Sequence, residues 1–311
     1  MTRLRNTEDG IPLAHCVEYY KQRTTKNGLL ISEATMISPD SDGYSFAPGL
    51  YNDAQIDGWK SVVNAVHGKG GIIFNQLWHI GRAGATNPIS ASAIPIRGTN
   101  MLGGEHLIPI HFSGVEIHAA NGYLIDQFIN SSSNVRTDEY GGSIENRARF
   151  ALEVIDAVVE AVGAKNVAIR LSPWSEFLDV RDATPVATWS YITQKLQQIH
   201  PDLAYIHFIE ARMSGLSDVD VEPEESLNPF RDIWKGPFIN CGGYNRNKAI
   251  QTCEQRENSL VAFGRVFIAN PDLVERLRHD LPMNKYNRPT FYTQGTDGYI
   301  DYPFYSDTEA Y

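Results

Sequence analysis

Three polar side chains of different chemistry follow one another closely in the segment from Gly114 to Tyr123. A short β-branched run ends at His118, Asn121 follows after two small residues, and Tyr123 comes just beyond Gly122. His118 and Asn121 can both donate hydrogen bonds toward one point, and the phenol of Tyr123 can give up a proton. Two neutral donors beside a proton source are suited to holding a carbonyl-type oxygen while a neighbouring carbon is protonated. On this segment alone, a strand and loop with the histidine and tyrosine buried in the core is the stronger interpretation.

The composition of the chain is that of an ordinary globular protein and argues against two classes of partner. The 311 residues are 42% hydrophobic and 21% charged, and the length suits one large α/β domain. With 27 basic and 37 acidic residues the formal charge is -10, which disfavours nucleic acid and anionic membranes as partners. No apolar run approaches the roughly 18 residues of a membrane span, and residues 1–6 do not resemble a signal peptide.

The cysteines indicate a compartment and argue against metal chemistry. Cys16, Cys241 and Cys253 are odd in number, widely separated and without the spacing of metal ligands. A reducing compartment fits this pattern, so we expect a cytoplasmic protein that carries no metal.

Apolar runs alternate with amphipathic helical patterns along most of the chain, which predicts repeated strand–helix units and a parallel sheet. We expect strands at residues 28–34, 72–77, 115–120, 167–171, 203–210, 238–241 and 260–263. We expect helices beginning near Val17 and at Asn52 or Asp53, and others at 144–162, 189–199, 247–256 and 272–279. The helix at 144–162 is the clearest, with an apolar face of Ala148, Leu152, Ile155, Val159 and Val162.

Seven strands in this order, with no internal repeat and no linker, predict a single domain over residues 1–311. The nearest closed architecture is a parallel (β/α)8 TIM barrel. A doubly wound sheet is the alternative, but the Gly-x-Gly-x-x-Gly sequence expected after its first strand is absent. Two parts of a full barrel are missing from the pattern. The first strand would precede Thr2, and the stretch at 81–113 lacks the helix expected between the third and fourth strands of a full barrel.

Polar residues and glycines gather where the predicted strands end, and barrels place their active sites at these ends. The ends carry Glu33-Ala34, Gln76, His118, Arg170, Glu210, Gly242-Gly243 and Gly264-Arg265. The last two pairs follow the final two strands, where barrels commonly bind phosphate. Glycines there let backbone N–H groups approach the anion, and Arg265 would neutralise it. Tight turns and a surface ion pair are the alternative explanation of the same residues.

The side chains of Gln76 and Arg170 would point into the mouth of the barrel, where they could hydrogen-bond a flat heteroaromatic ring. Each is, by itself, more often a structural polar residue. Together with the phosphate site and the His/Asn/Tyr group they make a coherent site for flavin mononucleotide (FMN). A serine hydrolase would need a nucleophile elbow, which is absent. A metal site is weakly supported, and His79 is better explained as a packed or capping residue than as a ligand.

Several longer stretches resemble one family, the old yellow enzymes, which are flavin-dependent ene reductases and NADPH dehydrogenases. The resemblance covers almost the whole chain. Its most specific parts are Phe-Asn-Gln-Leu-Trp-His-Ile-Gly-Arg at 74–82, residues 114–128, Arg-Thr-Asp-Glu-Tyr-Gly-Gly-Ser-Ile-Glu-Asn-Arg at 136–147, and Phe-Gly-Arg at 263–265. The stretch Arg-Leu-Ser-Pro-Trp at 170–174 is most similar to fungal members.

The resemblance implies a role for each matching residue. The implied cofactor-binding residues are Thr2 and Ala34 beside the flavin ring, Gln76 and Arg170 at its pyrimidine side, and Gly242, Gly243, Gly264 and Arg265 at the phosphate. His118 and Asn121 would bind the activating oxygen of the substrate, and Tyr123 would be the proton donor. The residues implied to shape the substrate pocket are Trp78, Phe177, Phe291 and Tyr292.

The resemblance also implies a ping-pong reaction on small molecules. Hydride would pass from NADPH, or NADH, through the flavin to the Cβ of an α,β-unsaturated carbonyl compound or nitroalkene, and Tyr123 would protonate Cα. Such an enzyme would be a monomer or a homodimer.

The two missing parts leave three hypotheses open. The chain is a shortened form of a working ene reductase, or it is a non-catalytic remnant that binds, scaffolds or folds poorly. A missing strand leaves open barrel edges and unpaired backbone groups, which are costly where they are buried. The third hypothesis is a specialised biosynthetic reductase or isomerase of the same family. Tyr123 favours the reductase in that case, since loss of the proton donor favours isomerisation.

Overall fold

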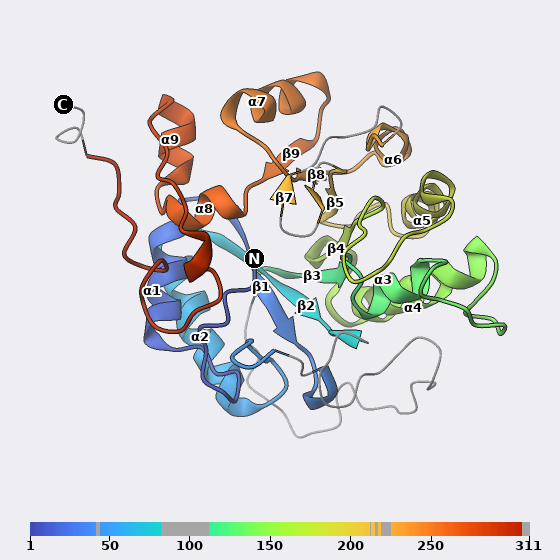
Figure 1. Ribbon diagram of the computed structural model, residues 1–311, viewed down its shortest axis with the longest axis horizontal. Coiled ribbons are helices and arrows are strands. Elements are labelled where there is room, and N and C mark those ends of the chain that lie inside the picture. The colour runs from blue at the N-terminus through green and yellow to red at the C-terminus, as the bar shows by residue number, and fades with distance from the viewer. Residues whose placement is uncertain (42–43, 82–111, 212, 215–216, 219–224, 307–311) are drawn as a thin grey trace.

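The described part of the chain forms one curved parallel sheet surrounded by helices. The computed structural model describes residues 1–41, 44–81, 112–211, 213–214, 217–218 and 225–306. Figure 1 shows the main strands arranged around a common centre, with the helices outside them. The seven strands pair in the order β1-β2-β3-β4-β5-β8-β9, and every neighbouring pair is parallel.

All seven predicted strands are confirmed, with small differences at their ends. They are β1 (Leu29–Met36), β2 (Ile72–Trp78), β3 (Gly114–Ala119), β4 (Val167–Leu171), β5 (Tyr205–Ile209), β8 (Phe238–Cys241) and β9 (Ser259–Ala262). A short antiparallel pair, β6 (Met213–Ser214) and β7 (Ser217–Asp218), follows β5.

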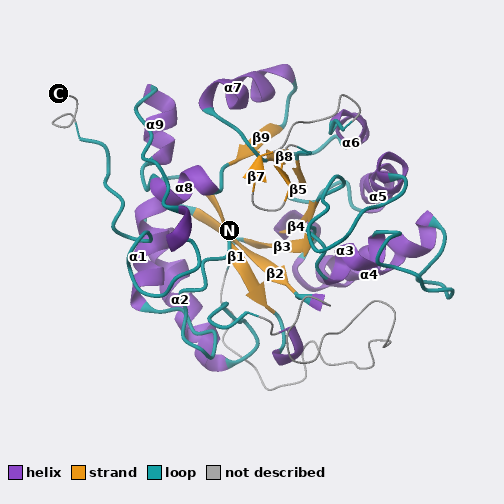
Figure 2. Cartoon of the chain, in the orientation of Figure 1, coloured by secondary structure: helices purple, strands orange, loops and turns teal. Residues whose placement is uncertain are grey.

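The predicted helices are confirmed as well, and Figure 2 shows them in purple around the orange strands. They are α1 (Ala14–Arg23), α2 (Asp53–Gly68), α4 (Ile144–Val162), α5 (Pro185–Ile199), α7 (Arg246–Gln255) and α9 (Leu273–His279). The described residues also form three short α-helices that were not predicted, α3 (Leu124–Ile129), α6 (Asn228–Ile233) and α8 (Arg265–Ala269). Helix α5 begins earlier than the apolar pattern predicted. Proline at the first position sets the backbone of its first turn, where Val186 is exposed and adds nothing to an apolar face.

The buried face of α4 differs from the predicted face. Ala148 and Ile155 are buried as expected, but Val162, at the end of the helix, is 43% exposed. Arg147 is buried instead, because its guanidinium donates to the carbonyl of Ile129 at 2.9 Å and pairs with Asp182 at 3.1 Å. Apolar periodicity does not reveal a charged residue that is buried with its partners.

The strands bury different side chains on their two faces. The outer face forms the larger core, in which residues such as Ile117, Ile169 and Phe208 pack against helices. The inner face starts with an apolar layer of Phe74, Ala168, Tyr205 and Ile239. Because side chains alternate along a strand, the next inward positions toward the carboxyl ends are polar. These are Gln76, Glu116, His118, Arg170, His207 and Cys241.

The fold is TIM-barrel-like and incomplete, as predicted. Within the described residues, β1 and β9 are the ends of the strand order, and no strand joins them. The N-terminal segment contacts both edges. The N–H of Arg3 donates to Glu33 of β1 at 3.0 Å, and a Cβ at Gly264, just after β9, would lie 3.4 Å from the Met1 sulfur. The sequence predicted that the stretch at 81–113 lacks a helix of the full barrel. Residues 82–111 lie outside the described part of the chain, so this prediction stays untested.

Candidate active site

His118 lies near the end of β3 with its ring on the inner face of the sheet. The side chain is 5% exposed, and its Nδ1 has no hydrogen-bond partner among the described residues. Burial, together with the nearby Arg170 charge, lowers the pKa of His118 to about 3. The imidazole is therefore neutral at physiological pH, with one N–H to donate and one nitrogen to accept.

Asn121 and Gly122 form a tight turn after β3 in which both residues are left-handed. Their φ angles are 57° and 72°, a region that asparagine and glycine tolerate best. The backbone N–H of Asn121 donates to the Ser172 hydroxyl at 2.7 Å, and that of Gly122 donates to Asp126 at 2.7 Å. A Cβ at Gly122 would meet the Phe177 carbonyl at 2.6 Å, so the turn requires glycine. These contacts fix the backbone of the turn that carries Asn121.

Tyr123 begins α3 and lies between two aromatic rings. It is edge-on to Trp78, with ring centroids 5.1 Å apart, and edge-on to His118 at 5.2 Å. Tyr44 stacks on Trp78 and hydrogen-bonds Tyr123. Burial, followed by the effect of Tyr44, raises the pKa of Tyr123, so the phenol stays protonated. Two members of the predicted trio, His118 and Tyr123, thus lie together at the carboxyl end of β3, and the turn that carries Asn121 joins them.

Arg170 and Gln76 also face the interior at this end. Arg170 pairs in register with His118 on one side and His207 on the other. Its Nη2 lies 3.9 Å from the Cys241 sulfur, and its Nε is buried without a partner among the described residues. Burial alone would raise the pKa of the Cys241 thiol, but His207 and Arg170 bring it down to about 7. The inner surface below the trio is therefore a cluster of charged and hydrogen-bonding groups.

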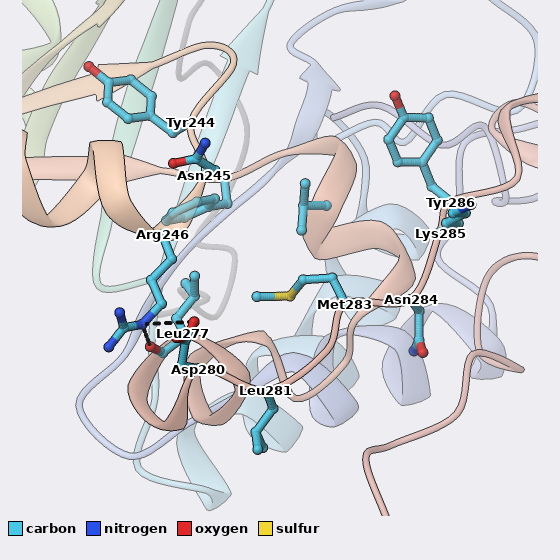
Figure 3. Close-up of a pocket in the computed structure, with 12 residues that line it drawn as sticks. Tyr244, Asn245, Arg246, Leu277, Asp280, Leu281, Met283, Asn284, Lys285 and Tyr286 are labelled. Carbon is cyan, nitrogen blue, oxygen red and sulfur yellow. Dashed lines mark hydrogen bonds and ion pairs between the residues drawn. The ribbon is translucent and has the colours of Figure 1, made fainter. Parts of the chain in front are cut away.

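The predicted phosphate-binding glycines follow β8 and β9. Gly242 and Gly243 both have positive φ, 124° and 63°, and Gly264 caps α8, of which Arg265 is the first residue. A cavity of about 600 Å³ adjoins these loops. Its lining comes from three segments, shown as sticks in Figure 3, and consists of Tyr244, Asn245, Arg246, Phe263, Val266, Leu277, Asp280, Leu281, Met283, Asn284, Lys285 and Tyr286. Arg265 lies over the ring of Tyr286, its guanidinium carbon 5.9 Å from the centroid.

The remaining predicted residues surround the trio unevenly. Ala34 is buried in the cluster that contains Trp78 and Tyr123. Thr2 precedes Arg3, whose backbone N–H donates to the Glu33 carboxylate of β1. Tyr292 is 45% exposed and near enough to Tyr123 to affect its pKa. Phe291 is fully buried and packs on Tyr286 and Arg3.

Several residues of the site were missed by sequence reasoning. Tyr44 lies in an irregular segment. The side chains of Ser172 and Asp126 accept hydrogen bonds from the backbone N–H groups of Asn121 and Gly122, and no sequence pattern predicts such contacts. Glu116 and His207 could in part have been found from the sequence. Glu116 is two residues before His118 on the same strand, and His207 lies at the position on β5 that pairs with Arg170, so both side chains share the inner face with a predicted site residue.

The residues present fit a bound FMN. Buried nitrogens without partners are uncommon, yet His118 Nδ1 and Arg170 Nε both occur at the inner end of the sheet. A polar ring would satisfy such groups. The described residues include no group of three or more His, Cys, Asp or Glu side chains placed to hold a metal ion. Within the same residues, no helix is both long and apolar enough to cross a membrane.

Comparisons with known proteins identify the family. Residues 1–95 and 108–284 match the model of the NADH:flavin oxidoreductase / NADH oxidase family. The 12-oxophytodienoate reductase 1 of Oryza sativa subsp. japonica is 43% identical over 340 residues, covering 99% of this chain and 89% of the relative. The 12-oxophytodienoate reductase 7 of the same plant is 41% identical over 352 residues, covering 98% and 89%.

Solved structures agree with this assignment. Morphinone reductase superposes with a TM-score of 0.87 at 39% identity, covering 99% of this chain and 91% of that one. Morphinone reductase in complex with tetrahydroNAD gives a TM-score of 0.86, also at 39% identity, covering 99% and 93%. The likeness to fungal members stays a prediction. The chain belongs to the NADH:flavin oxidoreductase / NADH oxidase family and is an old yellow enzyme, an FMN-dependent oxidoreductase that uses NAD(P)H to reduce activated C=C bonds.

Proposed function

We propose that the chain, acting as one FMN-binding domain over residues 1–311, reduces the C=C bond of α,β-unsaturated carbonyl compounds at the end of β3. The observation that carries this proposal is the buried Nδ1 of His118, which has no partner among the described residues and lies beside the protonated phenol of Tyr123. Nitroalkenes, whose activating group is also a polarisable oxygen, fit the same donors.

His118 and Asn121 would bind the activating oxygen of the substrate. Both are neutral donors, so they stabilise negative charge as it develops on that oxygen without transferring a proton to it. The left-handed turn at Asn121 and Gly122 is held by Ser172 and Asp126, so the backbone that carries the Asn121 amide is fixed before substrate arrives.

Tyr123 would supply the proton to Cα. Its O–H bond breaks as the Cα–H bond forms, and the phenolate then takes a proton from solvent. Because burial raises the pKa of Tyr123, the phenol gives up its proton only to a strongly basic carbon. Bound FMN supplies the hydride that reaches Cβ, after reduction by NADPH or NADH.

Three groups of residues would hold the cofactor. Thr2 and Ala34 would lie beside the ring, Gln76 and Arg170 at its pyrimidine edge, and Gly242, Gly243, Gly264 and Arg265 at the phosphate. Support for the last group comes from the positive φ angles after β8 and the cavity beside both loops. The residues that would form the wall above the ring are Trp78, Phe177, Phe291 and Tyr292.

Purification of the full chain tests this proposal against the remnant hypothesis. We expect a yellow protein whose flavin absorbance is bleached by NADPH under anaerobic conditions and recovers on addition of 2-cyclohexenone. A folded, colourless protein that takes up no added FMN would support a non-catalytic remnant. Loss of the C=C bond with gain of two hydrogen atoms, one as hydride and one as a proton, identifies a reductase. A shifted double bond without NADPH consumption identifies the isomerase alternative.

We further infer that the chain acts in the cytoplasm as a monomer or homodimer. The free thiols of Cys16, Cys241 and Cys253 support a reducing compartment. Fractionation with a fluorescent fusion and light scattering of the purified protein test these two points.

A further inference from the structure

Glu116 is a fully buried carboxylate on the inner face of β3, two residues before His118. One carboxylate oxygen accepts a hydrogen bond from Nε2 of Gln76 at 2.6 Å, and the other accepts one from Nδ1 of His207 at 2.8 Å. Burial opposes its ionisation, but the His207 charge prevails and lowers the pKa of Glu116 to about 2. Glu116 is therefore a carboxylate at neutral pH, and a carboxylate can only accept hydrogen bonds.

The carboxylate determines which way the Gln76 amide faces. Oxygen and nitrogen of an amide have nearly the same shape, so packing alone does not distinguish the two orientations. Only the NH2 group can bind an acceptor-only carboxylate, and the carbonyl oxygen of Gln76 must then face away from Glu116. That carbonyl oxygen accepts no hydrogen bond from the residues that the structure describes. As far as the described residues go, Gln76 thus presents an unused acceptor and a second, unused N–H.

His207 is fixed by the same carboxylate. Its Nδ1 must carry a proton to donate to Glu116. Burial disfavours the imidazolium, but the charge of Glu116 outweighs burial and raises the pKa of His207. The hydrogen-bonded pair of Glu116 and His207 lies beside Arg170, which is paired in register with His207. The Nε of Arg170 has no hydrogen-bond partner among the described residues, so it can bind a ligand at the mouth of the sheet.

We propose that Glu116 is a positioning residue for the flavin, which holds the Gln76 amide with its carbonyl toward the cofactor so that this oxygen accepts the ring N3–H. The pyrimidine part of the flavin has one N–H donor between two carbonyl acceptors, which is complementary to the acceptor and N–H that Gln76 presents. The inference rests on the proposed contact between Gln76 and the ring. Glu116 itself touches no cofactor atom in this arrangement.

The substitution Glu116→Gln tests the proposal because it keeps the shape and adds a donor. Gln at 116 can donate to the Gln76 carbonyl, which lets the Gln76 amide invert and face the ring N3–H with its own N–H groups. We expect the dissociation constant of FMN, measured by fluorescence quenching with the apo-protein, to rise roughly ten- to hundredfold. A general loss of packing would also weaken FMN binding, so the affinity for FMN alone does not distinguish it from an inverted Gln76 amide.

FMN methylated at N3 separates orientation from packing, because it has no N3–H to donate. Wild-type protein should bind it much more weakly than FMN, whereas Glu116→Gln should bind the two flavins almost equally. Glu210→Gln is the matched control. Glu210 is another strand-end carboxylate, but it binds Tyr244 at 2.5 Å, so this variant should keep the wild-type discrimination. Equal discrimination in wild type and Glu116→Gln would overturn the proposal.

Gln76→Met is a second variant for the case in which Glu116→Gln does not fold. Methionine keeps the length and removes the amide, so discrimination between FMN and its N3-methyl form should disappear. Discrimination that persists in Gln76→Met would show that Gln76 does not meet N3, and would also overturn the proposal. Wild-type protein that binds FMN and reduces enones without discriminating would refute this inference while leaving the proposed function in place.

Discussion

Tyr123 is edge-on to His118, with ring centroids 5.2 Å apart and ring planes at 89°. The two residues lie on either side of the Asn121–Gly122 turn, so that turn sets the separation of the proton donor from the oxygen-binding donors. A substrate oxygen bound by His118 and Asn121 would therefore have its Cα close to the phenol. Different steps of the reaction should depend on different members of this group.

Tyr123→Phe should slow alkene reduction while sparing flavin reduction. The phenylalanine keeps the edge-on packing against Trp78 and His118 but has no proton to give. We expect the oxidative half-reaction with 2-cyclohexenone to slow by roughly a hundredfold or more, in stopped-flow traces of flavin absorbance. Reduction by NADPH should proceed at the wild-type rate. Equal slowing of both half-reactions would remove Tyr123 from the proton-donor role.

Asn121→Ala should reduce turnover roughly a hundredfold or more while leaving flavin binding intact, because it removes one donor to the developing charge. The backbone turn would be retained in part, since Ser172 and Asp126 bind main-chain N–H groups rather than the amide side chain. The flavin content after purification is the control. An unchanged oxidative half-reaction rate would exclude Asn121 from oxygen binding.

Asp126→Asn should change how stability depends on pH. Burial raises the pKa of Asp126 from 3.8 to about 7 in the folded protein. Between these two pKa values the folded state holds a proton that the unfolded state has lost, so this residue makes stability fall as pH rises through that range. Asparagine carries no such proton. The variant should therefore lose less stability than wild type between about pH 5 and pH 7.5 in urea denaturation.

The control for this experiment is Asp57→Asn. Asp57 has 70% of its side chain exposed, so its replacement should leave the pH dependence of stability unchanged. If plots of the free energy of unfolding against pH are parallel for wild type and Asp126→Asn over the same range, Asp126 is ionised in the folded protein.

Arg5→Lys should destabilise the protein and loosen the substrate pocket. Arg5 is fully buried, and its guanidinium donates to the carbonyls of Thr290 at 2.7 Å and Asp297 at 2.9 Å. Lysine has one side-chain nitrogen and cannot bind all of these groups. We therefore expect the free energy of unfolding, measured by urea denaturation, to fall by roughly 1–3 kcal/mol. Because the same segment carries Phe291 and Tyr292, the KM for enones should rise.

Arg278→Lys is the matched control, because the Arg278 side chain is 60% exposed. This substitution should hardly change the free energy of unfolding. Equal stability of the two variants would show that the carbonyls around Arg5 do not depend on its guanidinium.

The order of elements and the inward-facing positions could be predicted from local pattern. Apolar runs such as 167–171 read as buried strands, and the parity of a strand places His118 and Arg170 on one face whatever the neighbours are. The predicted gathering of polar residues at the carboxyl ends also follows from parallel strands alone. The face predicted for α4 from helical periodicity was partly wrong, since Val162 is exposed and the pattern missed Arg147, which is buried with partners from elsewhere.

By itself, the sequence determined the strands, their parity and therefore which side chains enter the interior, because these depend on residues a few positions apart. Only the tertiary structure decided what each side chain meets there. Glu116 and His207 are 91 positions apart and Asn121 and Ser172 are 51 apart, yet both pairs are hydrogen-bonded. Such contacts depend on how the whole sheet curves, and no local pattern encodes them. They set the charge of Glu116 and the amide orientation of Gln76, and they support the turn that carries Asn121.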